Sequence, residues 1–193
     1  GGIGGLTAAA ALGQNGFEVT VAERSDSTGV EGVGISQQAN VVRALASLGL
    51  AEEYLAAGYA YETVEIYAPD GALVARVPSR SLIEGYPASL GIPRPALHRV
   101  LRAAATAAGA VIQNGVQVAE MVPSPDGVGV TLSDGTRASY DAVIGADGIY
   151  SQMRHTLFPD LPAPRFTGQA VWRYNLPRPP GFDALHVYNG PTG

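Results

Sequence analysis

The sequence contains no cysteine and no lysine, and these two absences exclude whole classes of chemistry. Without cysteine the chain has no disulfide, no thiolate metal ligand and no cysteine nucleophile. All twelve basic residues are arginines, so a Walker A lysine and a lysine Schiff base are excluded as well. The three histidines, His98, His155 and His186, are far apart in sequence, so we expect surface or helix-end histidines and no metal site.

Positive charge and long apolar runs are also scarce. The net charge is -5 and the arginines are scattered, which argues against a nucleic-acid partner. No apolar stretch approaches the roughly 18 residues that span a membrane. No basic, apolar, cleavable leader appears in the given sequence, and a leader upstream of residue 1 is left open. With 46% hydrophobic and 15% charged residues among 193, we expect a soluble, cytoplasmic, globular protein of undetermined oligomeric state.

A glycine-rich turn that runs into an alanine-rich helix, "GGIGGLTAA", opens the chain. The dinucleotide fingerprint G-x-G-x-x-G needs one glycine for a tight turn, one for close approach to pyrophosphate and one for helix-on-strand packing. Gly2 and Gly5 take the second and third places, and Gly1 takes the position between the first two. We therefore expect the first glycine and its strand upstream of residue 1, in a longer protein.

An acidic residue follows the glycines at the distance that a nucleotide-binding βαβ unit requires. The predicted helix over 5–14 presents unpaired N–H groups and a partial positive charge to a pyrophosphate. The apolar strand over 17–24 ends in Glu23, whose carboxylate can accept hydrogen bonds from the ribose hydroxyls of adenosine. Arg24 lies either beside the adenosine or simply in solvent.

Hydrophobic periodicity and turn residues predict the remaining elements. The run over 140–148 is continuously apolar, as in a strand buried on both faces of a parallel sheet. We expect helices over 39–48, 95–108 and 150–157, a hairpin over 62–68 and 72–77, and strands over 110–113, 115–122, 127–132, 136–139, 140–148, 168–176 and 183–190. Trp172, Tyr174 and Tyr188 are expected to pack in sheets.

The stretch "GADGIYSQMR", residues 145–154, resembles the D-G-x-x-S-x-x-R signature of the class A flavoprotein monooxygenases, the family of para-hydroxybenzoate and salicylate hydroxylases. "GGIGGLTAA", "GVGISQQANVVRALASLGL" (32–50) and "PRPALHRVL" (93–101) resemble further stretches of that family in the same order. The antiparallel run over 115–139 is also the layout of FAD-binding Rossmann proteins of the glutathione reductase type. The resemblance implies an α/β FAD-binding Rossmann-like fold with an antiparallel β-meander.

The resemblance also assigns residues to the cofactor, each with a simpler alternative. Asp147 and Gly148 are assigned to the FAD pyrophosphate, although Asp147 also fits a cap of the following helix. Arg94 is assigned to a contact near the flavin, or is a solvated loop arginine. Arg154 belongs to the same signature, or forms a structural salt bridge. Val118 lies where a strand backbone meets adenine in relatives, or is plain core.

The activity that the resemblance implies is hydroxylation of a small aromatic substrate. NADH or NADPH would reduce FAD, and the flavin would capture O2 as a C4a-hydroperoxide that transfers one oxygen atom. Because the flavin carries this chemistry, we expect no catalytic side chain in this stretch. The alternatives are another FAD-dependent reductase or oxidase of the same fold, and a non-catalytic NAD-binding module.

The expected domains are both discontinuous. Residues 1–58 and 93–158 are assigned to the FAD-binding domain, and 59–92 and 159–193 to part of an interleaved β-sheet substrate domain. The Gly-Asp motif that binds the ribityl chain in this family has no counterpart before Gly193. We expect this motif, and most of the substrate-covering sheet, farther along a longer chain.

Overall fold

The computed structural model describes residues 1–190, which form two compact units. The first unit contains Gly1–Val30 and Leu101–Trp172, and the second contains Glu31–Val100 and Arg173–Gly193. The domain limits expected from the sequence stay a prediction, and residues 191–193 of the expected second domain lie outside the described residues.

The first unit begins with the helix and strand that the glycine motif predicts. Helix α1 (Ile3–Gln14) is followed by β1 (Thr20–Glu23), which pairs in parallel with β7 (Val111–Asn114). The helix ends where Gly16 takes a φ of +83°, the left-handed conformation that favours glycine after a helix. Leu6, Ala9 and Ala10 form its buried face. The register sets Glu23 opposite Asn114 at the carboxyl ends of both strands.

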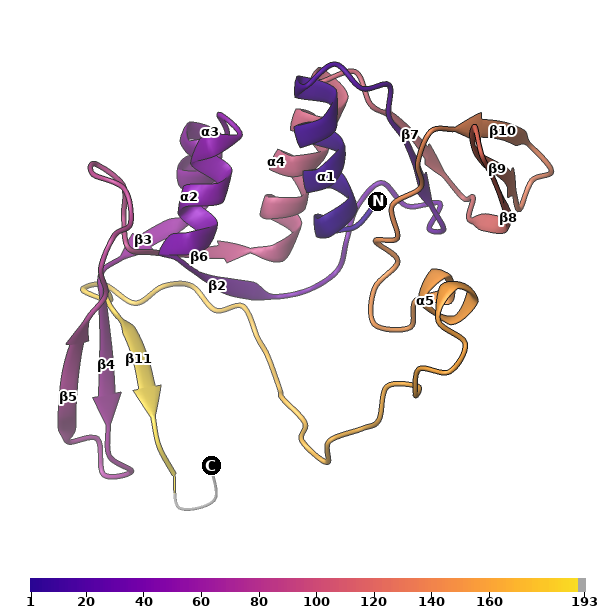
Figure 1. The fold of residues 1–193 in the computed structure, drawn as a ribbon. Helices are drawn as coiled ribbons and strands as arrows, with labels where there is room; N and C mark the ends of the chain where they lie inside the picture. The colour runs from indigo at the N-terminus through magenta and orange to yellow at the C-terminus, as the bar shows by residue number, and fades with distance from the viewer. Residues whose placement is uncertain (191–193) are drawn as a thin grey trace. The chain divides into compact units, whose positions relative to one another are not determined.

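Small residues let α1 lie close to the end of helix α4 (Arg94–Ala107), as Figure 1 shows. A Cβ atom added at Gly13 would lie 2.9 Å from the Cβ of Ala108 and closer still to its carbonyl oxygen. Ala105, on the preceding turn of α4, is fully buried. A glycine is therefore required at this position of α1 for the two backbones to approach.

An antiparallel meander completes the sheets of the first unit, as the sequence predicts. Its strands are β8 (Val118–Ser124), β9 (Gly127–Leu132) and β10 (Arg137–Tyr140), with β9 in the middle. Val116, Val130 and Leu132 form a buried cluster on this sheet. The short helix α5 (Gln152–Leu157) follows.

Two predicted strands are wrong. Residues 141–150 form no strand, and Ile144 in that run is 59% exposed. Residues 168–176 form no strand either, and Trp172 and Tyr174, expected in a sheet, are 82% and 81% exposed. A strand exists only where a neighbouring strand accepts and donates its backbone hydrogen bonds. Within residues 1–190 no strand pairs with either run.

The second unit contains two three-stranded sheets. One consists of β2 (Gly34–Gln38), β6 (Ser89–Pro93) and β3 (Tyr59–Tyr61), all antiparallel, with helices α2 (Ala39–Ser47) and α3 (Ala51–Ala56) after β2. Its core contains the buried side chains of Val42, Tyr54, Leu90, Ile92 and Leu97. The sequence predicts α2, and also the start of α4, to which Leu97 belongs. It misses the three strands and α3.

The other sheet of the second unit confirms the predicted hairpin. Strand β4 (Thr63–Tyr67) pairs with β5 (Leu73–Pro78) on one side and, in parallel, with β11 (Leu185–Tyr188) on the other. Figure 1 shows the three strands side by side. The strand predicted over 183–190 is thereby confirmed as β11, which includes Tyr188. None of the helices in residues 1–190 combines the length and apolar character that crossing a membrane requires.

Replacement of Gly13 by alanine is expected to destabilise the chain. The new methyl group must push α1 away from the carbonyl of Ala108, and overpacking of this kind costs about 1–3 kcal/mol. Gly4→Ala on the same helix is the control, because nothing lies within 4 Å of a Cβ there and alanine is the better helix former. In urea, Gly13→Ala should unfold at a lower midpoint concentration than the wild type. Equal midpoints for the wild type and Gly13→Ala would refute the close approach.

Candidate functional site

The first turn of α1 has no internal cap. Gly2 is the N-cap residue and makes no side-chain cap hydrogen bond, and no acidic residue stands in the first turn. The first hydrogen bond within the helix runs from the amide of Leu6 to the carbonyl of Gly2, over 2.9 Å. The earlier amides thus have no acceptor in the helix and concentrate its positive dipole end. Nothing lies within 4 Å of where a Cβ of Gly2 or Gly4 would stand.

Glu23 is held beside this turn by an ion pair with the amino group of Gly1 and by a backbone hydrogen bond. Its Oε2 lies 3.0 Å from the nitrogen of Gly1, and its Oε1 accepts a 2.8 Å hydrogen bond from the amide of Ser25. A Cβ at Gly1 would lie 2.6 Å from Oε2, so only glycine permits this approach. Partial burial acts to raise the pKa of Glu23. The hydrogen bonds from Ser25 and Gly1 and the charges of the Gly1 amino group and Arg24 outweigh that effect, and the pKa is lowered.

The segment of the predicted signature also approaches the start of α1. A Cβ at Gly5 would lie 3.5 Å from the Cβ of Ala146, directly before Asp147. Gly148 has a φ of +84°, which turns the chain into α5. The structure thus brings Gly1, Gly2, Gly5 and Glu23 together and places the residue before Asp147 against the same turn.

Asp147 itself caps α5, the simpler of its two expected roles. Its Oδ2 accepts a hydrogen bond from the amide of Met153 over 3.1 Å. Partial burial acts to raise the pKa of Asp147, but hydrogen bonds from Ser151 and from the amides of Met153 and Gln152 lower it. Ser151 adds a second cap by accepting from the amide of Arg154 over 2.9 Å. These contacts leave an assignment of Asp147 to the cofactor as a prediction.

The other residues of the first unit that the sequence assigned to the cofactor have ordinary structural contacts or lie in solvent. The guanidinium of Arg154 donates to the carbonyl of Ile149 over 2.8 Å, which ties α5 to the preceding turn in place of the expected salt bridge. Arg24 is exposed beside Glu23. Val118 packs at the edge of the meander cluster, and its backbone pairs with Leu132. Their contacts with a cofactor stay predictions.

Arg94 belongs to the second unit, at the start of α4. Its side chain is exposed, and its Nη1 donates to the carbonyl of Glu31 over 3.0 Å. It thus lies exposed against the loop before β2, and its contact with a cofactor stays a prediction.

The sequence analysis missed Asn114, which stands opposite Glu23 on β7. Its Oδ1 atom is buried without a hydrogen-bond partner within residues 1–190. A buried polar atom of this kind normally has a partner, from protein, water or ligand. The available signal was its place directly before Gly115 at the end of a predicted strand.

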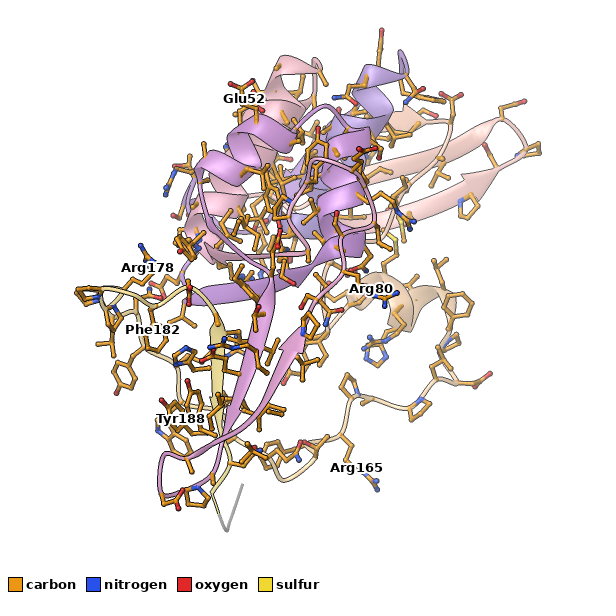
Figure 2. All side chains as sticks on the ribbon, turned by 90° about the vertical axis from the view of Figure 1, so that its left-hand side faces the viewer. Glu52, Arg80, Arg165, Arg178, Phe182 and Tyr188 are labelled. Atoms are coloured by element: carbon orange, nitrogen blue, oxygen red, sulfur yellow. The ribbon has the colours of Figure 1, made fainter. Side chains whose placement is uncertain are left out.

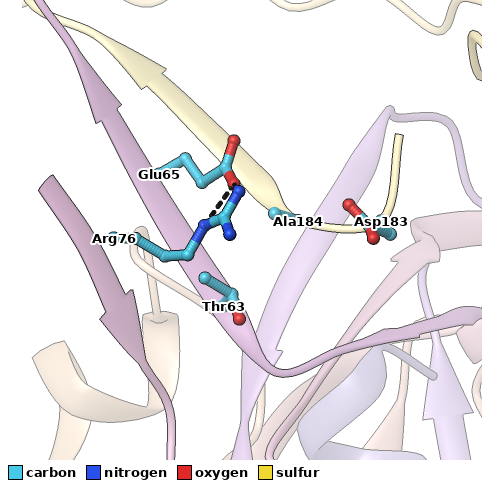
Figure 3. A pocket seen from close by; sticks show the side chains of 5 residues that line it. All are labelled: Thr63, Glu65, Arg76, Asp183 and Ala184. Carbon is cyan, nitrogen blue, oxygen red and sulfur yellow. Dashed lines mark hydrogen bonds and ion pairs between the residues drawn. The ribbon is translucent and has the colours of Figure 1, made fainter. Parts of the chain in front are cut away.

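A second missed group lies on the sheet of the second unit and centres on the buried Glu65. Its carboxylate accepts hydrogen bonds from the Tyr67 hydroxyl and from Arg76 Nε over 2.8 Å, and His186 Nε2 lies 3.2 Å away. Figure 3 shows Glu65 and Arg76 facing each other across β4 and β5. They line a small depression of about 120 Å³ together with Thr63, Asp183 and Ala184.

Aromatic rings surround the histidine of this group. Phe182 and Tyr188, labelled in Figure 2, come from the segment before β11 and from its last residue. The centroid of the Phe182 ring lies 3.9 Å from that of His186, and Tyr188 stacks on Tyr67 at 4.7 Å. His186 is therefore a partly buried strand residue. The expected surface or helix-end position is wrong for it, and a surface position is wrong for the buried His98.

The first unit sets the uncapped start of α1 beside the carboxylate of Glu23. In the comparison with known proteins, residues 1–174 match a family model described as "FAD binding domain". The chain is 38% identical over 180 residues to 3-amino-4-hydroxybenzoate 2-monooxygenase of Streptomyces cremeus, covering 91% of this chain and 44% of that protein. It is 33% identical to 3-hydroxybenzoate 6-hydroxylase of Polaromonas naphthalenivorans, covering 100% of this chain and 50% of that protein.

A solved structure shares the fold as well. It is the tetrameric form of 2-methyl-3-hydroxypyridine-5-carboxylic acid oxygenase, with a TM-score of 0.68 and 30% identity over 81% of this chain and 40% of that one. The chain thus spans about half the length of the curated relatives it matches.

The Glu65 group predicts an acid-sensitive stability. Hydrogen bonds from Tyr67 and Arg76 lower the pKa of Glu65 below its ordinary 4.5, against the effect of burial. A carboxyl with a lowered pKa stabilises the folded state above its unfolded pKa and loses that contribution as the pH falls through the folded value. Urea unfolding at neutral pH should therefore show Glu65→Gln to be less stable than the wild type.

The gap between Glu65→Gln and the wild type should narrow as the pH falls below about 4.5. Glu62→Gln, on an exposed neighbour, is the control and should follow the wild type at every pH. A constant gap between Glu65→Gln and the wild type would contradict a charge contribution from Glu65.

Proposed function

Because the chain belongs to the FAD-binding domain family, we propose that it is the cofactor-binding part of a FAD-dependent monooxygenase that hydroxylates a small aromatic substrate with NAD(P)H and O2. The cofactor is FAD. We propose that the protein works in the cytoplasm, where NAD(P)H is supplied. The aromatic substrate is proposed because relatives are named for hydroxybenzoates, as in 3-hydroxybenzoate 6-hydroxylase.

The observation that carries the proposal is the pairing of open helix amides with a fixed carboxylate. The uncapped first turn of α1 offers N–H donors to the diphosphate, and Gly2 leaves room for it. Glu23, with its lowered pKa, presents an ionised acceptor to the hydroxyls of the adenosine ribose. One motif thus addresses both the phosphate and the sugar of the same ligand.

The remaining candidate residues take supporting roles in this proposal. Asp147 and Gly148 shape the turn that approaches α1 near Gly5, and Arg24 and Val118 border the adenosine. Arg94 is proposed as a contact of the cofactor, and Arg154 fixes α5. The polar face around Glu65 belongs to the substrate domain, whose proposed pieces are residues 59–92 and 159–193, beside an FAD-binding domain of 1–58 and 93–158.

In this mechanism the chain binds and orients, and FAD, when bound, supplies hydride acceptance and oxygen activation. The amides of α1 and the carboxylate of Glu23 hold the adenosine diphosphate end in place. No proton transfer is assigned to a side chain of residues 1–190. The catalytic power of this part therefore lies in positioning the cofactor.

The function is tested on the flavin-loaded enzyme with NADH or NADPH, a panel of hydroxybenzoates and 18O-labelled O2. Mass spectrometry should find one labelled oxygen atom in the aromatic product. Dehydrogenated substrate with release of hydrogen peroxide would instead identify an oxidase. A protein that binds no flavin would leave only a nucleotide-binding module.

Glu23→Ala is expected to weaken FAD binding without unfolding the protein. A hydrogen bond to a charged group contributes about 1.5–3 kcal/mol, so the dissociation constant should rise by roughly tenfold to a hundredfold. Titration of the apoenzyme with FAD, followed by flavin fluorescence, measures this change. Glu18→Ala, at an exposed position of the preceding loop, should bind FAD as the wild type does. Unchanged affinity in Glu23→Ala would remove Glu23 from the site.

A further inference from the structure

Asn114, the last residue of β7, lies on the same face of the two-stranded sheet as Glu23. The parallel register pairs the two residues directly, and side chains that stand opposite each other in a ladder point to the same side of the sheet. Ala22, one residue earlier on β1, packs against the meander cluster, so Glu23 and Asn114 point to the other side. The ends of the two strands therefore present a carboxylate and a carboxamide side by side.

Backbone hydrogen bonds fix this end of β7 to the end of β1 and the loop that follows it. The amide of Gly115 donates to the carbonyl of Ser25 over 3.1 Å. The amide of Val116 donates to the carbonyl of Glu23 over 3.0 Å. Gly115 has a φ of +73°, a turn that favours glycine directly after the strand. The backbone that carries Asn114 is therefore held in place beside Glu23.

The side chain of Asn114 has a hydrogen-bonding capacity that the protein does not use. Its Oδ1 is buried, and no group within residues 1–190 donates a hydrogen bond to it. The residue as a whole is only half-buried, and the Cβ–Cγ bond of an asparagine turns through a broad range of angles. A rotation about this bond can therefore bring the oxygen to the exposed side of the residue without breaking a hydrogen bond.

The order of the groups along the ligand indicates which of them Asn114 meets. In the proposed function the amides of α1 bind the diphosphate and Glu23 binds the ribose. The adenine base is attached to that ribose, and Asn114 is the neighbour of Glu23 on the adjacent strand. Adenine offers N–H donors at N6 beside an acceptor at N7, and an asparagine carboxamide matches this pair with one acceptor and one donor.

We propose that Asn114 binds the adenine base of FAD through N6 and N7 and thereby selects an adenine nucleotide. This inference rests on the proposed function, in which Glu23 binds the adenosine ribose. Oδ1 accepts a hydrogen bond from the N6 amino group and Nδ2 donates one to N7, so both halves of the carboxamide gain a partner. A base with an acceptor in place of the N6 amino group, such as hypoxanthine, places that acceptor opposite Oδ1 and is disfavoured.

The first test compares ADP with inosine diphosphate (IDP), which carries an oxygen in place of the N6 amino group and keeps N7. Each nucleotide is titrated against FAD bound to the enzyme, and displacement of FAD is followed by flavin fluorescence. The wild type should bind ADP about tenfold more tightly than IDP, and Asn114→Leu should bind the two alike. Equal binding of ADP and IDP by the wild type would overturn the proposal without the use of any variant.

The stability of Asn114→Leu separates binding from folding. Leucine repeats the branched shape of asparagine and leaves no buried acceptor without a partner, so the apoenzyme should be at least as stable in urea as the wild type. Its FAD dissociation constant should nevertheless rise about tenfold. Replacement of a purely structural asparagine would lower the urea midpoint or weaken ADP and IDP equally, and either result would overturn the proposal.

Gln113→Leu is the matched control on the same strand. Gln113 pairs with Ala22 across the ladder, so its side chain points to the face opposite Asn114. The variant removes a side-chain amide of the same kind and should keep the FAD affinity of the wild type and its preference for ADP. Loss of that preference in Gln113→Leu would assign it to the strand as a whole and contradict the role of Asn114.

The outcomes separate this inference from the proposed function. If the protein binds no FAD, the proposed function fails and the inference fails with it. If FAD binds and Glu23→Ala weakens it, while Asn114→Leu keeps both the affinity for FAD and the preference for ADP, only the contact of Asn114 fails.

Discussion

The uncapped amino end of α1 is the constraint on which the first unit depends. A helix that begins with unpaired amides is unstable there unless a partner supplies acceptors, and neither a side-chain cap nor an acidic residue does so in the first turn. The strand that follows nevertheless ends in a carboxylate, which the structure sets beside Gly1 at 3.0 Å. An arrangement that leaves donors open and fixes an acceptor nearby is suited to a ligand with phosphate and hydroxyl groups.

Elements with a local signal were predicted well from the sequence. The α/β FAD-binding class is confirmed by the family match, and the meander, the hairpin, α1 and β1 are confirmed by the structure. Strands β2, β3 and β6 were missed because their pairing joins segments far apart in the chain. The run over 140–148 shows the converse error: apolar composition indicates burial, but a strand also needs a neighbour.

The candidate site shows the same difference between residues with a local sequence signal and residues brought together by long-range pairing. Glu23 and the opening glycines were predictable, because a motif fixes their spacing within one βαβ unit. The Glu65 group was not, since its members come from β4, β5 and β11 and meet only through sheet register. Asp147 was predicted in place, but its carboxylate caps α5, a role that its side-chain type equally favours.

The buried or fixed charges differ in the groups that hold them. The carboxylate of Glu65 accepts hydrogen bonds from Arg76 and Tyr67 and lies beside His186. Its negative charge is therefore compensated within the protein. Glu23 accepts a hydrogen bond from the amide of Ser25 and forms an ion pair with the amino group of Gly1. Arg94 donates to the carbonyl of Glu31, a dipole that orients the guanidinium without neutralising it. In both cases a glycine lies against the charged side chain, because a Cβ at Gly1 or Gly32 would occupy its place. These glycines therefore leave the space in which the two charged side chains lie.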